Sequence, residues 1–127
     1  MVKITLMKKL NLILLILILS ASLSLAQESK PAEMINAQAG HNFTITLSAN
    51  PTTGYQWQLA RPLNDKMIKL ISSEYIADDT GLVGSGGKQV WKFRALTAGR
   101  AAIALKYVRP WEKNTTPEVK YFIVVIK

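Results

Sequence analysis

The side chains that usually carry catalysis or bind metals are scarce in this sequence. Its 127 residues contain no cysteine and a single histidine, His41. Without a thiol there is no cysteine nucleophile, no disulfide and no thiolate metal site. Ser85 lies among glycines, but the sequence offers no histidine partner that would act as its base. We therefore expect no enzyme, no metal and no cofactor, and we expect His41 to be an exposed turn residue.

One short segment combines residues that stiffen a backbone. It reads Asn50-Pro51-Thr52-Thr53-Gly54 and lies between two stretches of alternating pattern. Proline fixes φ at about −65°, glycine accepts a positive φ, and β-branched threonines have few rotamers. A stiff exposed loop loses little entropy when it docks, so the composition indicates a binding loop. An ordinary turn is the alternative.

A second connection, from Gly81 to Gly87, is rich in glycine. Gly84, Gly86 and Gly87 permit the close approach of a partner's backbone. No Gly-Lys-Ser/Thr sequence and no helix follows, which argues against a phosphate cradle. The alternative is a flexible hairpin loop without a binding role.

A third connection, Arg109-Pro110-Trp111-Glu112, places an aromatic residue among polar neighbours. Tryptophan and arginine are the residue types that most often anchor interfaces. We interpret Trp111 as an exposed anchor. Trp57 and Trp91, in contrast, lie on the apolar faces of predicted strands and are expected in the core.

The segments that position these connections have the period of β-strands. Tyr121–Ile126 is apolar on both faces, which is typical of a strand in the middle of a sheet, and Met67–Ile76 is interpreted as a strand although it also fits a short helix. Apolar and polar residues alternate over Phe43–Leu47, Tyr55–Leu59, Trp91–Ala95 and Ile103–Tyr107. Six or seven short strands without a helix-length amphipathic segment predict an all-β protein, an antiparallel β-sandwich.

The first residues have the pattern of an export signal. Three lysines precede the apolar run Leu10–Leu19, and Ser24-Leu25-Ala26 offers small residues at a cleavage site. We predict a signal peptide over residues 1–26, cleavage before Gln27, and a periplasmic or secreted protein. The alternative is an uncleaved anchor helix, although the run is near the lower limit for spanning a bilayer. Cleavage leaves one domain, residues 27–127, that begins with a loose polar segment, Gln27–Gln38.

The charge of the predicted domain is moderately basic. Removing the leader takes three lysines from the 16 Lys and Arg, so 13 basic residues stand against 8 acidic ones. These basic residues are scattered and form no run, which argues against nucleic-acid binding. We expect a monomer that has no membrane contact after cleavage.

Taken in order, the three connections carry a resemblance to a known family. Asn-Pro-Thr-Thr-Gly-Tyr-x-Trp, Gly-x-Gly-Gly and Arg-Pro-Trp together resemble the chagasin family of cysteine peptidase inhibitors. The resemblance extends from about Ala37 to Lys127, and the three motifs show no departure from the family pattern. The segments Lys113–Pro117 and Met67–Asp79 are less diagnostic.

The resemblance implies an immunoglobulin-like sandwich with three binding loops at one end. It also implies reversible, competitive, non-covalent inhibition of papain-like cysteine peptidases, whose thiolate–imidazolium pair lies in a cleft. Thr52, Thr53 and Gly54 would then lie over the catalytic cysteine, with the glycines of the second loop along one wall of the cleft and the third loop along the other. The implied peptidase-binding residues are Asn50, Pro51, Thr52, Thr53, Gly54, Tyr55, Gly84, Gly86, Gly87, Arg109, Pro110 and Trp111.

A second class of function stays open at this point. An envelope module for adhesion or carbohydrate binding would use the same fold and the same exposed tryptophan. The arrangement of the loops distinguishes the two, because a cleft binder needs three loops at one edge and a sugar binder needs a flat aromatic face.

Overall fold

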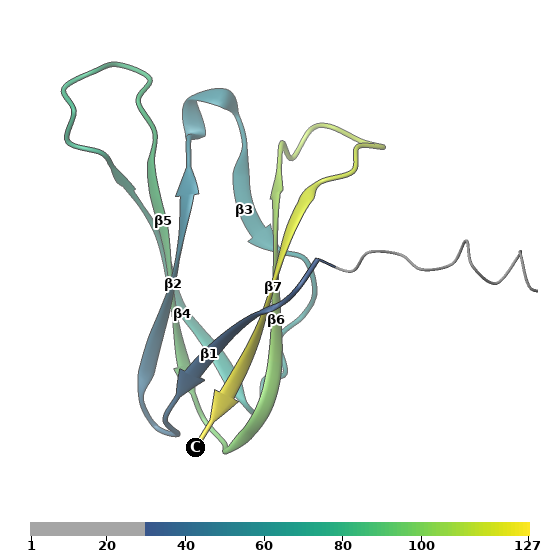
Figure 1. Cartoon of the computed structure of the whole chain (residues 1–127). Helices are drawn as coiled ribbons and strands as arrows, with labels where there is room; N and C mark the ends of the chain where they lie inside the picture. The colour runs from purple at the N-terminus through teal and green to yellow at the C-terminus, as the bar shows by residue number, and fades with distance from the viewer. Residues whose placement is uncertain (1–29) are drawn as a thin grey trace, which may run out of the picture. The chain divides into compact units, whose positions relative to one another are not determined.

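The computed structural model describes residues 30–127, so the predicted signal peptide lies outside the described residues. Within them the chain is almost entirely β-structure, as predicted (Figure 1). The strands are β1 (Glu33–Ala37), β2 (Asn42–Ala49), β3 (Gln56–Leu59), β4 (Ile68–Ala77), β5 (Gly87–Ala95), β6 (Gly99–Val108) and β7 (Glu118–Ile126). One turn of 3₁₀-helix spans Pro51–Thr53.

The strands form two sheets, with the orders β1-β7-β6-β3 and β2-β5-β4. Neighbouring strands are antiparallel except β1 and β7, which run parallel. The apolar segment Tyr121–Ile126 belongs to β7, between β1 and β6, which confirms its predicted place inside a sheet. Met67–Ile76 is also a strand, since β4 covers Ile68–Ala77 with a bulge between Leu70 and Ser72.

The prediction of a loose segment up to Gln38 is wrong in its last part. Residues 33–37 form β1, paired in register from Glu33 opposite Phe122 to Ala37 opposite Ile126. This pairing satisfies backbone groups along the outer edge of β7 that would otherwise need water. Ile35 and Ala37 are partly buried against the core. The stabilisation of β1 comes from pairing with β7, which lies more than eighty residues away in the sequence. The polar composition of the segment therefore did not predict a strand.

The core lies between the sheets and follows the alternation in the sequence. Trp57 and Trp91 are 4% and 5% exposed, as expected from their places on apolar strand faces. The indole nitrogen of Trp57 donates to the carbonyl of Ser48 at 2.9 Å, which ties β3 to the facing sheet. The other buried members include Ile45, Leu47, Ile68, Phe93, Ile103, Leu105, Phe122, Val124 and Ile126. The core contains no disulfide, so packing stabilises this domain.

The connections β2–β3, β4–β5 and β6–β7 all lie at one end of the sandwich (Figure 1). They are the three segments that the sequence singled out. Lys127, which follows β7, lies at the opposite end. Across residues 30–127, no helix has the length and apolar character needed to cross a membrane.

Candidate functional site

The β2–β3 loop is a folded turn held by its own residues. The carbonyl of Asn50 accepts from the Thr53 amide at 3.2 Å and from the Thr53 hydroxyl at 2.7 Å. The Asn50 side-chain oxygen accepts from the Thr52 amide and hydroxyl, and the Gly54 amide donates to the Pro51 carbonyl. Gly54 closes the turn with φ of 83°, the left-handed conformation that glycine adopts most easily. The stiffness predicted from the composition is therefore present as hydrogen bonds.

Asn50 also joins this loop to its neighbours. Its backbone amide donates to the hydroxyl of Tyr107 on β6 at 2.9 Å. Its side-chain nitrogen donates to the carbonyl of Gly84 in the β4–β5 loop at 3.2 Å. One residue at the start of the first loop thus contacts the second loop and the strand that leads to the third.

Arg109 links the third loop to the first. Its Nε donates to the Thr53 carbonyl at 3.0 Å, and its guanidinium carbon lies 4.4 Å from the centre of the Tyr55 ring. Its Nη1 donates to Glu112 Oε1 at 2.9 Å. The hydrogen bond with this carboxylate raises the pKa of Arg109 above its ordinary value. Tyr55 in turn stacks on Tyr107, with ring centres 5.1 Å apart, so Arg109 rests on an aromatic column.

The Trp111 side chain is largely exposed, but one edge of its ring contacts the first loop. Its side chain is 67% exposed, as expected for an anchor. A Cβ added at Gly54 would overlap the far edge of its indole ring, so the ring lies directly against the glycine of the first loop. Gly54 is therefore needed twice, for its positive φ and for the absence of a side chain under the tryptophan.

The second loop presents two apolar residues that the sequence analysis did not select. Leu82 is 74% exposed and Val83 is fully exposed at the tip of the loop. Their position between glycines, away from any alternating pattern, is the signal that would have identified them. Gly84 has φ of 80° and free space where a Cβ would lie. Gly87 is instead buried at the start of β5, where a Cβ would overlap the Ile76 carbonyl.

The predicted site residues thus divide by position. Pro51, Thr52, Thr53, Gly84, Pro110 and Trp111 are exposed at the loop end. Asn50, Gly54, Tyr55, Gly86 and Arg109 are half-buried and connect the loops or support them. The three loops lie together at one edge, the arrangement expected of a cleft binder rather than of a flat aromatic face.

Comparison with known proteins agrees with this arrangement. Residues 36–126 match the family model described as "Chagasin family peptidase inhibitor I42". The chain belongs to the chagasin family of peptidase inhibitors. It is 39% identical to Amoebiasin-1 of Entamoeba histolytica over 63% of this chain and 76% of that protein. It is 29% identical to Chagasin of Trypanosoma cruzi over 61% of this chain and 73% of that protein.

A solved structure extends the similarity to the fold. The crystal structure of a cysteine protease inhibitor from Entamoeba histolytica superposes with a TM-score of 0.66 at 27% identity, covering 79% of this chain and 91% of the other. Membership of the chagasin family favours an inhibitor over an enzyme and over a carbohydrate-binding module.

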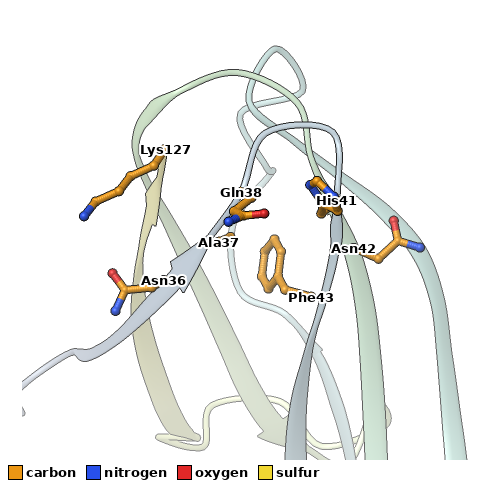
Figure 2. Close-up of a pocket in the computed structure, with 7 residues that line it drawn as sticks. All are labelled: Asn36, Ala37, Gln38, His41, Asn42, Phe43 and Lys127. Atoms are coloured by element: carbon orange, nitrogen blue, oxygen red, sulfur yellow. The ribbon is translucent and has the colours of Figure 1, made fainter.

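A separate groove of about 420 Å³ lies at the other end of this chagasin-family domain (Figure 2). His41 is exposed there, as predicted, and no serine, cysteine or acidic side chain lines the groove beside it. The lining residues are Asn36, Ala37, Gln38, His41, Asn42, Phe43 and Lys127. Within residues 30–127, no cluster of three or more His, Asp or Glu side chains is placed to hold a metal ion. The loop end therefore remains the candidate site.

Proposed function

We propose that this chagasin-family domain inhibits papain-like cysteine peptidases by placing its three loops in the active-site cleft, reversibly, competitively and without a covalent bond. The first loop would lie over the catalytic cysteine, and the second and third loops would contact opposite walls. Family membership supports the class of activity. The common position of the loops supports the mode of binding.

The observation that carries this mechanism is the hydrogen bonding of the first loop. The carbonyl oxygens of Asn50, Pro51 and Thr53 all accept hydrogen bonds within the inhibitor. Cleavage requires a carbonyl carbon about 3–3.5 Å from the nucleophile and in line with it. We expect these internal hydrogen bonds to keep the carbonyl groups of the folded turn out of that alignment with the thiolate. The loop can fill the cleft and still resist cleavage.

The loop residues divide the work of binding. Thr52, Thr53, Pro110 and Trp111 present exposed surface to the peptidase, and Leu82 and Val83 add an apolar tip to the second loop. Asn50, Gly54, Tyr55 and Arg109 support that surface from within. Gly84 leaves the turn of the second loop without a side chain. Gly86 and Gly87 allow close backbone packing where the loop joins β5.

Titration of residues 27–127 against papain and a cathepsin-L-like enzyme tests the proposal. We expect competitive inhibition that is reversed by dilution, and no inhibition of trypsin or of a metallopeptidase. Mass spectrometry of the recovered inhibitor should show an uncleaved chain without an adduct. Comparable inhibition of trypsin, or a covalent adduct with the cysteine enzyme, would contradict the proposed mechanism.

The proposal includes export of the chain to the periplasm or the outside. The three early lysines, the apolar run Leu10–Leu19 and the small residues before Gln27 support a cleaved signal peptide over residues 1–26. Mass spectrometry of the exported protein should find Gln27, or a residue within a few positions of it, at the amino terminus. Recovery of the full-length chain from membranes would instead indicate an uncleaved anchor.

A further inference from the structure

Glu112 lies just outside the three sequence motifs, yet it contacts the residue that joins two of the loops. Its carboxylate accepts from Arg109 Nη1 at 2.9 Å, and its amide donates to the Arg109 carbonyl at 3.1 Å. The two side chains are 34% and 29% exposed, so each is largely covered. The backbone turn thus places the carboxylate where it restrains the guanidinium group.

The restrained guanidinium group is directed toward the first loop. Nε donates to the Thr53 carbonyl, and the planar group lies over the Tyr55 ring. An arginine side chain has many rotamers, and fixing it costs conformational entropy. A carboxylate on one side and an aromatic face beneath reduce the alternatives that the free protein samples. Arg109 therefore has an ordered position before any partner arrives.

From this geometry we propose that Glu112 is a positioning residue, which holds Arg109 against the first loop so that the first and third loops meet the peptidase as one preassembled unit. The inference rests on the proposed function and adds a residue to it. Trp111 lies between Arg109 and Glu112 in the sequence, and its indole ring lies against Gly54 of the first loop. A surface that is already ordered loses less entropy on binding.

A double-mutant cycle separates positioning from direct contact. Glu112→Ala should raise the inhibition constant about five- to tenfold, a typical effect for a partly exposed charged hydrogen bond. Glu112→Gln should raise the inhibition constant only about two- to threefold, because its amide oxygen still accepts from Arg109. In an Arg109→Ala background, Glu112→Ala should add less than about twofold, because the side chain through which it acts is gone. Asp65→Ala, in the β3–β4 connection at the other end of the sandwich, removes an exposed carboxylate away from the three loops and is the control.

If the fold-changes in the inhibition constant for Glu112→Ala and Arg109→Ala multiply in the double variant, the inference is overturned. That result would mean that Glu112 contacts the peptidase independently of Arg109. An unchanged inhibition constant for Glu112→Ala would overturn it as well. Both outcomes leave the inhibitory function of the wild-type protein intact.

Nuclear magnetic resonance tests the restraint without any peptidase. In the wild-type protein the Arg109 Nε–H signal should be shifted by the Tyr55 ring and exchange slowly with water. Glu112→Ala should move it toward the position of a free arginine, and Glu112→Gln should partly restore it. An unchanged signal in Glu112→Ala would refute the positioning role, even if wild-type inhibition failed and the proposed function with it.

Discussion

Two tryptophans of this domain differ in what holds them, and their substitution should separate binding from stability. Trp111 is largely exposed on Gly54, whereas Trp57 is buried and donates to the Ser48 carbonyl. Trp111→Ala should raise the inhibition constant about 30- to 1000-fold, the usual range for an interface anchor, and leave the melting temperature nearly unchanged. Enzyme titration and thermal melts of the purified variants measure both quantities.

Trp57→Ala provides the opposite case. Removal of a buried aromatic typically costs about 3–5 kcal/mol, which lowers the melting temperature of a domain of this size by more than about 10 °C. Its inhibition should be retained in proportion to the folded fraction. If Trp111→Ala unfolds the domain, or inhibits as well as the wild type, then the third loop is structural and the site assignment is wrong.

At the scale of single elements, the first loop depends on a glycine that no side chain can replace. Gly54→Ala puts a Cβ into a backbone with φ of 83° and into the indole of Trp111. We expect the ring to be displaced and the inhibition constant to rise at least about tenfold. Tryptophan fluorescence and enzyme titration follow the two effects.

Gly40→Ala separates strain from the clash. Gly40 has nearly the same φ, 82°, with free space around a built Cβ, and it lies in the turn between β1 and β2 at the other end of the domain. The Gly40→Ala substitution should lower the free energy of unfolding by about 1–2 kcal/mol and leave inhibition unchanged. Equal inhibition by Gly54→Ala and the wild type would show that contact between the first loop and Trp111 is not needed.

How much of an element the sequence reveals depends on where its stabilising contacts lie. β2, β5 and β6 were predictable because alternation within each strand records which face is buried. β1 was not, because its stability comes from parallel pairing with β7. The motifs of the three loops were recognisable one by one. The hydrogen bond from Arg109 to Thr53 spans 56 residues and leaves no local pattern in the sequence. The contact between the first and third loops could therefore be seen only in the structure.

At the scale of the whole domain, the proposed binding loops lie at the opposite end of the sandwich from the groove. The loops occupy one end, and the groove at His41 and Lys127 occupies the other (Figures 1 and 2). The core between them is continuous and apolar. Substitutions at the far end should therefore leave inhibition by the folded protein unchanged, whereas substitutions of the exposed loop side chains should act mainly on inhibition.

The position of Lys127, together with the absence of any native thiol, makes the domain suitable for oriented attachment to a surface. A single cysteine introduced by Lys127→Cys gives one reactive group at the end away from the loops, and Lys113→Cys gives one in the third loop. On a biosensor, protein attached through residue 127 should bind a papain-like enzyme within about twofold of its affinity in solution. Attachment through residue 113 should weaken binding at least about tenfold by blocking the approach of the enzyme. Equal binding in both orientations would mean that the peptidase approaches from another side.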